Sequence, residues 1–275
     1  MEFWQHIYSN FDPVAINIFG LKIHWYGLMY ISALLSALYI AQWIIKKDKL
    51  NISNKMINSY FIYAEIGIIL GARLGYFLFY SNNPMYYFIH PWEMFNPFDV
   101  NGEFVGLRGM SYHGAMIGFV ISSLLFVKKN KISFLFLMDI VAISIPLAYT
   151  FGRIGNFLNK ELIGRVTELP IGIYIDGVLR HPSQLYEAFL EGIILFIIIY
   201  SYRKYKNFNG ELMALYLFFY GLFRFIIEYV REPDIQLGFI CCGWMTMGQL
   251  LCIIMMLLAL ILYIIGYKVK MRSII

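Results

Sequence analysis

The stretch MTMGQLLCIIMMLLALILYIIGY, residues 245–267, holds no charged side chain and ends against the basic run KVKMR at 268–272. A helix needs about 20 consecutive apolar residues to cross the hydrocarbon core of a bilayer. A helix that is apolar on every side is buried either in a large protein core or in lipid. The stretch therefore predicts a membrane-spanning helix.

The composition extends this prediction to the whole chain. Of the 275 residues, 60% are apolar and 14% are charged, with a net charge of +5. Soluble domains average about 45–50% apolar and about 25% charged residues. Too little polar surface remains to coat a water-facing globule, so we expect an all-α polytopic membrane protein forming one domain over 1–275. Disorder, a coiled coil and a nucleic-acid binder are excluded as descriptions of the whole chain.

Seven segments are predicted as transmembrane helices because each is long and apolar enough to span a bilayer. They cover residues 25–45, 59–80, 110–127, 132–151, 184–202, 211–230 and 245–267. The longer connections are 81–109 and 152–183, and the alternating stretch Ile171–Gly177 in the second predicts a small hairpin. We see no internal repeat, which disfavours a transporter built from duplicated halves.

Basic residues predict the orientation of these helices. Alternate connections and the C-terminal end hold most of the lysines and arginines: Lys46, Lys47, Lys49, Lys55, Lys128, Lys129, Lys131, Arg203, Lys204, Lys206, Lys268, Lys270 and Arg272. Connections rich in Lys and Arg stay in the cytoplasm. We therefore expect the N-terminus outside, the C-terminus in the cytoplasm, and 81–109 and 152–183 on the outer face. The opening residues lack the basic start of a cleavable signal peptide.

No metal or redox site is predicted. Cys241, Cys242 and Cys252 form no CxxC motif, so we interpret them as packing residues. The five histidines show no HxxxH spacing. We expect no metal and no cofactor.

The strongest local feature is GRIGNFLNKELIGR at 152–165, where the fourth segment reaches the outer face. Its glycines allow tight turns and close approach to a ligand, and its arginines offer forked donors suited to phosphate. The alternative is a polar cap that ends a helix, which needs fewer such residues. The candidate binding residues here are Arg153, Asn156, Glu161, Gly164 and Arg165.

A second candidate lies in the sixth segment. Arg224, Glu228 and Arg231 are spaced i, i+4, i+7 and share one helical face. The alternative is an ion pair that joins helices, the interpretation we favour for Asp139, Glu65 and Glu191. Two arginines around one glutamate leave a positive surplus, which indicates an anionic ligand.

Three further clusters lie at the same predicted depth. His113 in GMSYHG (109–114) can act as a base or an oriented donor, although a lone histidine in a helix is more often structural. HWYGLMY (24–30) contains Tyr26, and RHPSQLYE (180–187) contains Glu187. The predicted topology places six of these residues in the outer half of the bilayer: Tyr26, His113, Arg153, Glu187, Arg224 and Glu228. Their common depth predicts a site for an anionic lipid head group.

These motifs resemble the bacterial prolipoprotein diacylglyceryl transferases. The runs at 24–30, 109–114, 152–165, 180–187 and 220–234 (YGLFRFIIEYVREPD) match that family in the same order over nearly the whole chain. Two positions depart from its usual pattern, where Ala115 and Lys160 each replace a glycine. Neither change removes a functional group.

The resemblance implies transfer of diacylglyceryl from phosphatidylglycerol to the lipobox cysteine thiol of a preprolipoprotein that still carries its signal peptide. The products are a thioether and glycerol phosphate. It further implies a bacterial cytoplasmic (inner) membrane location, a site toward the outer leaflet, and no nucleic-acid partner. A monomer is the default expectation.

Residue roles follow from this resemblance and from the residue chemistry. Arg153 and Arg224 are expected to grip the phosphate, and His113 to be either the base for the thiol or an organiser of the arginines. Glu228 and Glu161 would orient the arginines, and Tyr26 and Asn156 would contact the head group. The full expected binding set is Tyr26, Asn156, Glu161, Gly164, Arg165, Glu187, Glu228 and Arg231.

Two other classes of protein compete with this interpretation. A lipid flippase would need polar groups past the midplane, where the chain offers little beyond Asp139 and Glu65. A membrane scaffold would not need outer arginines beside glycine-lined turns. We also expect the outer loops to gate or line the path of the acceptor.

Overall fold

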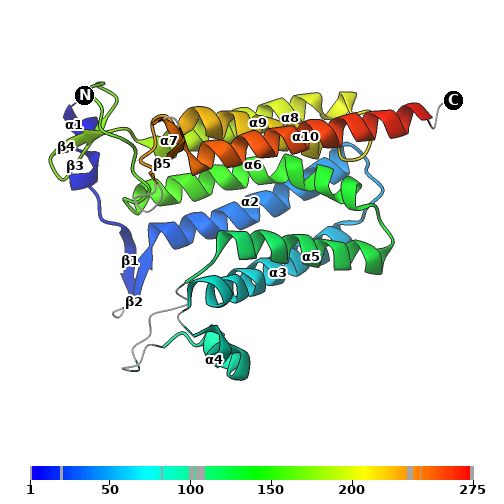
Figure 1. The fold of residues 1–275 in the computed structure, drawn as a ribbon, viewed down its shortest axis with the longest axis horizontal. Helices are drawn as coiled ribbons and strands as arrows, with labels where there is room; N and C mark the ends of the chain where they lie inside the picture. The colour runs from blue at the N-terminus through cyan, green and yellow to red at the C-terminus, as the bar shows by residue number, and fades with distance from the viewer. Residues whose placement is uncertain are drawn as a thin grey trace. The chain divides into compact units, whose positions relative to one another are not determined.

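The structure is a computed structural model that describes residues 2–18, 21–81, 83–98, 102, 109–233, 238–241 and 243–272. The long apolar runs of the sequence form its long helices. By their internal contacts, Met1–Lys49 and Leu135–Ile275 form one compact unit, and Leu50–Phe134 forms a second. Figure 1 shows the order of the elements in each unit. The expectation of a single domain stays a prediction.

The first unit is a bundle of helices in which α9 packs along α10. Its main helices are α2 (Trp25–Lys47), α6 (Phe134–Leu158), α7 (Ser183–Glu187), the π-helix η3 (Ala188–Ile194), α8 (Leu195–Tyr202), α9 (Glu211–Ile227) and α10 (Met247–Arg272). The elements α7, η3 and α8 follow one another without a break. The predicted segment 184–202 is thus one helix with a π-helical stretch in its middle.

Small elements cover one end of this unit. They are α1 (Glu2–Gln5), η1 (Ile7–Ser9), β1 (Val14–Ile18), β2 (Leu21–His24), β3 (Ile173–Ile175), β4 (Val178–Arg180), β5 (Phe239–Cys241) and β6 (Met245–Thr246). The strands pair as three antiparallel hairpins, and β3–β4 confirms the hairpin predicted at 171–177. Its turn residues Asp176 and Gly177 have φ of +49° and +79°, as a tight Asp-Gly hairpin turn requires. Tyr8, Phe157 and Ile173 form a small buried core beneath it.

The opposite end of the first unit is held by partly buried ion pairs. Asp139 accepts hydrogen bonds from Lys206 Nζ at 3.0 Å and from the Gly210 amide at 2.8 Å. Arg203 Nε lies 2.9 Å from Asp48. The interpretation of Asp139 as a contact between helices is confirmed.

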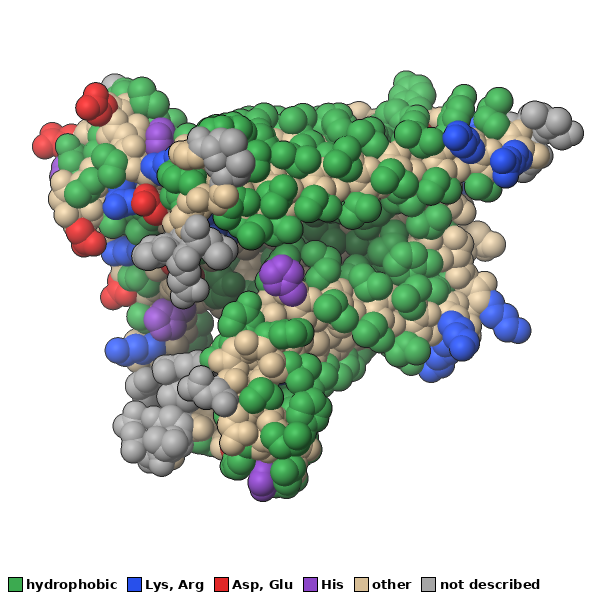
Figure 2. All heavy atoms as spheres, in the orientation of Figure 1, with side chains coloured by type: hydrophobic (Ala, Val, Ile, Leu, Met, Phe, Trp, Pro, Cys, Tyr) green, Lys and Arg blue, Asp and Glu red, His purple; other side chains and the backbone are tan. Residues whose placement is uncertain are grey.

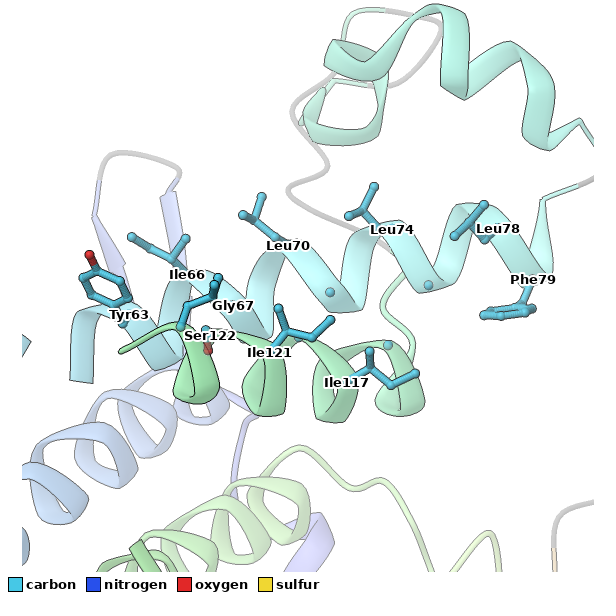
Figure 3. A pocket seen from close by; sticks show the side chains of 15 residues that line it. Tyr63, Ile66, Gly67, Leu70, Leu74, Leu78, Phe79, Ile117, Ile121 and Ser122 are labelled. Atoms are coloured by element: carbon cyan, nitrogen blue, oxygen red, sulfur yellow. The ribbon is translucent and has the colours of Figure 1, made fainter. Parts of the chain in front are cut away.

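The second unit consists of α3 (Asn54–Tyr80), α4 (Pro84–Ile89), the 3₁₀ helix η2 (Pro91–Phe95) and α5 (Tyr112–Asn130). The helices α3 and α5 pack backbone to backbone through glycines: a Cβ on Gly71 would lie 2.3 Å from the Gly114 carbonyl oxygen. An apolar groove of about 620 Å³ runs along this seam from Tyr63 to Phe79, floored by glycines and walled by Ile and Leu (Figure 3). Such glycine-mediated packing is typical of helices in membranes.

All seven predicted helices are present, and five of the described helices are long and apolar enough to cross a membrane: α2, α3, α6, Ser183–Tyr205 and α10. Their flanks are largely apolar, while basic side chains gather toward helix ends (Figure 2). At about 1.5 Å per residue, the 17 residues of α9 fall short of the roughly 30 Å core. The 19 residues of α5 include Lys128 and Lys129 in its last turn. A polytopic membrane protein is therefore supported, while the count of seven spans and their orientation stay predictions.

Candidate functional site

The carboxylate of Glu187 is the centre of the site. Glu187 ends α7, is fully buried, and its Oε2 atom lies 2.8 Å from Arg153 Nε and 2.9 Å from Arg224 Nη1. Its other oxygen, Oε1, lies 3.6 Å from Arg231 Nη1. The three arginine side chains keep 15–16% of their surface exposed. One buried carboxylate thus gathers three guanidinium groups from α6, α9 and the chain just after α9.

Glu228 forms a second ion pair with Arg224. Its Oε2 lies 3.3 Å from Arg224 Nη2, an i,i+4 pair at the end of α9. Thr246 Oγ1 donates to Glu228 Oε1 at 3.1 Å, and a Cβ on Gly248 would lie 2.7 Å from that oxygen. The predicted stripe on one helix face is present only in part, because α9 ends at Ile227 and Arg231 lies beyond it. The orienting role of Glu228 toward Arg224 stays a prediction.

Arg165 and Gly164 fasten the loop between α6 and α7 to the end of α9. The Arg165 amide donates to the Val230 carbonyl at 2.8 Å, and its guanidinium donates to the backbone carbonyls of Arg231 and Glu228 at 2.8 and 3.1 Å. A Cβ on Gly164 would lie 2.5 Å from the His181 carbonyl oxygen, so only glycine allows this close approach. Both residues fix the loop between α6 and α7 against the chain that carries Arg231.

The two expected head-group contacts, Tyr26 and Asn156, and the expected orienting residue Glu161 also lie in this unit. Asn156 Oδ1 accepts from Arg153 Nη1 at 3.2 Å, and a Cβ on Gly155 would lie 3.3 Å from Tyr26 Cδ2. The Glu161 carboxylate accepts from Asn159 Nδ2 at 2.7 Å. No ion pair joins Glu161 to an arginine in the described part of the chain, so its orienting role stays a prediction. In this structure Glu187 pairs with Arg153 and Arg224.

Two members of the cluster, Tyr149 and Glu191, were not predicted as site residues. Tyr149 on α6 donates to Glu187 Oε2 at 3.1 Å and hydrogen-bonds to Glu191, while Arg153 Cζ lies 4.7 Å from the centre of its ring. Glu191 lies in the π-helix and is fully buried. The sequence signal for Tyr149 is its position one turn before Arg153. Glu191 was interpreted as part of an ion pair between helices, but in the described part of the chain it pairs with no cation and instead hydrogen-bonds to Tyr149.

His113 belongs to the other unit. It is exposed in the first turn of α5, where its ring meets that of Tyr112 edge-on at 5.9 Å. Its predicted place beside Arg153 and Arg224 therefore stays a prediction. No group of residues able to hold a metal ion occurs among the described residues.

His181 lies just before the membrane-spanning helix Ser183–Tyr205 and supports the loop that holds Arg165 through a backbone hydrogen bond. Its amide donates to the Arg165 carbonyl at 2.9 Å, and burial lowers the pKa of its imidazole. The ring is therefore neutral near pH 7 and adds no positive charge to the arginine cluster.

The charge of the site indicates its ligand. Three guanidinium groups share two ion-paired carboxylates, those of Glu187 and Glu228. Arginine forks with a net positive surplus are suited to phosphate. Within a bundle of helices able to span a membrane, this arrangement defines an integral membrane protein with a net positive arginine cluster suited to an anion.

Comparison with known proteins identifies the family. Residues 13–265 match the family described as "Prolipoprotein diacylglyceryl transferase". A phosphatidylglycerol–prolipoprotein diacylglyceryl transferase of Campylobacter jejuni subsp. jejuni serotype O:23/36 (strain 81-176) is 61% identical over 96% of this chain and 97% of its own length. Relatives of the same name from Campylobacter lari and Aliarcobacter butzleri are 60% and 54% identical, over 95% and 99% of this chain and 96% and 100% of their own lengths. The chain belongs to the prolipoprotein diacylglyceryl transferase family.

Proposed function

We propose that this chain transfers the diacylglyceryl group of phosphatidylglycerol to the lipobox cysteine thiol of a preprolipoprotein, the first step of lipoprotein maturation. The family membership and the names of relatives 54–61% identical support the reaction. The structural observation that carries it is the buried Glu187 carboxylate, which holds Arg153 and Arg224 at 2.8 and 2.9 Å.

The chemistry explains why arginines are needed. The thiol sulfur attacks the glyceryl carbon that bears the phosphate, a C–S bond forms, and the C–O bond to the phosphate breaks. The electron pair of that bond leaves with the phosphate oxygen, so negative charge develops on glycerol phosphate. Donors already held in place where charge develops stabilise the transition state most.

Arg153 and Arg224 are assigned to the departing phosphate. Glu187 and Glu228 hold their guanidinium groups in place before substrate arrives, so little reorganisation is needed during the reaction. Arg231 lies farther from Glu187, at 3.6 Å, and contributes positive charge. Tyr26, Asn156, Gly164 and Arg165 shape the surroundings of the head group.

His113 has two possible assignments in this proposal. It is either the base that removes the proton of the acceptor thiol or a hydrogen-bond donor that organises the arginines. A free thiol has a pKa of about 8.5, so proton removal accelerates its attack near neutral pH. If His113 is the base, His113→Gln removes the histidine limb of the pH–rate profile. If it organises the arginines, the variant lowers the rate equally at all pH values.

The membrane arrangement is part of the proposal. Seven helices span the bacterial cytoplasmic membrane, with the N-terminus outside, the C-terminus in the cytoplasm and the arginine site in the outer half. The positive-inside distribution of basic residues supports this orientation. Both substrates reside in the membrane and reach the site sideways between helices, and the outer loops line the path of the signal peptide.

The test uses purified protein in phosphatidylglycerol vesicles with a lipobox peptide, and follows release of glycerol phosphate. Arg153→Lys and Arg224→Lys keep the charge but lose the fork, and each should lower kcat about 10²-fold or more. Arg180→Lys is the matched control, because Arg180 pairs with the half-exposed Glu232. Normal turnover by a folded Arg153→Lys protein contradicts the assignment, and lipid movement without release indicates a flippase.

A further inference from the structure

One tyrosine hydroxyl lies between two buried carboxyl groups. Tyr149 Oη contacts Glu187 Oε2 at 3.1 Å and also contacts Glu191 Oε2. Both glutamates are fully buried. A phenol has a single hydrogen and can donate only one of these two bonds. In the other bond the carboxyl group must donate, so one of the two glutamates carries a proton.

The ion pairs decide which glutamate is protonated. Glu187 contacts three guanidinium groups, and such contacts stabilise the ionised form of a carboxyl group. No ion pair joins Glu191 to any cation in the described part of the chain, and its Oε1 atom is buried without a hydrogen-bond partner. A buried charge left uncompensated is costly, whereas a neutral carboxyl group costs much less. The proton therefore belongs to Glu191.

The groups around Glu191 support the same assignment. Arg224 already places one nitrogen on Glu187 and the other on Glu228, and Arg153 places its Nε on Glu187. Neither arginine forms an ion pair with Glu191. The charged and titratable groups that act on it from the packed helices are Tyr149 and Arg153 on α6, Glu187 on α7, Arg224 on α9 and Cys252 on α10.

We infer that Glu191 is a neutral carboxylic acid that donates to Tyr149, which in turn donates to Glu187. Glu191 and Tyr149 are thereby positioning residues for the arginine pair, an inference about their role that rests on the proposed function. Tyr149 holds Glu187 through its hydroxyl and Arg153 through its ring. An ionised Glu191 would give the three arginines a third carboxylate and cancel the positive surplus that binds phosphate.

The spacing of Glu187 and Glu191 explains how both carboxyl groups reach one hydroxyl, because residues four apart share a helix face, and Glu191 itself lies inside a π-helix. Glu187 and Glu191 lie on either side of the start of η3 (Ala188–Ile194). Single π-helical stretches inside α-helices occur often at functional sites. Gly192 allows this stretch to approach α6, because a Cβ there would lie 1.9 Å from Thr150 Oγ1.

Infrared spectroscopy tests the protonation directly and needs no turnover. The resting protein near pH 7 should show the carbonyl stretch of a protonated carboxylic acid, and Glu191→Gln should remove it. Glu211→Gln is the matched control: Glu211 is equally buried but accepts from Tyr202 Oη at 2.7 Å and the Phe208 amide at 3.3 Å, as an ionised carboxylate does. A wild-type spectrum without the band, or a band unchanged by Glu191→Gln, overturns the inference even if the protein is an active transferase.

Kinetics test the positioning role. Glutamine keeps a neutral donor, so Glu191→Gln should stay within about threefold of wild-type kcat. Tyr149→Phe removes a bond to the charged Glu187, and Glu191→Ala leaves the buried Tyr149 hydroxyl without its donor, so each should lose about tenfold or more. Rescue by glutamine but not by alanine is a pattern that simple packing would not give, provided that thermal unfolding shows similar stability. Equal damage from Glu191→Gln and Glu191→Ala would contradict the role. A wild-type protein with the infrared band but no transfer would refute the proposed function alone.

Discussion

Replacing Glu187 by glutamine is the sharpest perturbation of the site, since it changes one charge and almost no volume. Glu187 is fully buried, and its Oε2 atom accepts from Arg153, Arg224 and Tyr149. The substitution leaves Glu228 as the remaining ion-paired carboxylate for three guanidinium groups. Breaking a buried pair in this way costs about 3–5 kcal/mol.

Activity should suffer as well as stability. Without the shared carboxylate, the guanidinium groups of Arg153 and Arg224 repel each other and move apart. A displacement of about 1 Å can cost about 10²-fold in rate, so kcat for release of glycerol phosphate should fall at least that far. Thermal unfolding in the same vesicles gives the loss of stability, and a chromatographic profile shows that the variant is still folded.

Glu232→Gln is the control for this experiment. Glu232 also pairs with an arginine, Arg180, at 2.9 Å, but half of its side chain is exposed. Exposed pairs contribute about 1 kcal/mol or less, so its turnover should be unchanged. A folded Glu187→Gln protein with wild-type kcat and wild-type stability would refute the conclusion that Glu187 organises the arginines.

Three smaller changes give further tests. Gly192→Ala places a Cβ 1.9 Å from Thr150 Oγ1 and should lower the free energy of unfolding by about 1–3 kcal/mol; thermal unfolding of the double variant with Thr150→Ala should show recovery, and no recovery would mean that the clash lies elsewhere. Gly248→Ala pushes on the flexible end of Glu228 at 2.7 Å, so kcat/KM should fall about tenfold while the melting temperature stays constant; an unchanged kcat/KM would show that Glu228 does not orient Arg224. Burial lowers the pKa of His181 in the folded state below the unfolded value, which is about 6.5, so protonation favours unfolding and stability falls as pH drops through that value. His181→Gln should reduce this acid-side loss of melting temperature, and an identical pH dependence in both proteins would contradict it.

The helices could be predicted well because their cause is local. Residues 245–267 are apolar in sequence and form α10 from Met247 onward. The hairpin β3–β4 was equally accessible, since Asp176 and Gly177 are the residues that its turn needs. The β1–β2 hairpin was missed, although the alternation of Leu21–His24 is a strand signal.

The ion pairs at the centre of the site could not be predicted, because they join residues that are far apart in the sequence. The sequence shows Glu187 as one glutamate near a helix start, but its ion pairs join residues 34, 37 and 44 positions away. Glu161 is closer to Arg153 in sequence and was expected to orient it. In the structure its carboxylate accepts a hydrogen bond from Asn159 instead. Tyr149 was hidden in an apolar run. Which carboxylate meets which arginine depends on the packing of α6, α7 and α9.

The reconstituted transfer assay tests the central claim most directly. Wild-type protein in phosphatidylglycerol vesicles is given a lipobox peptide with Cys or with Ser at the acceptor position. We expect release of glycerol phosphate with the Cys peptide, a matching thioether product, and no release with the Ser peptide. Equal release with both peptides, or none from folded protein with the Cys peptide, would contradict it.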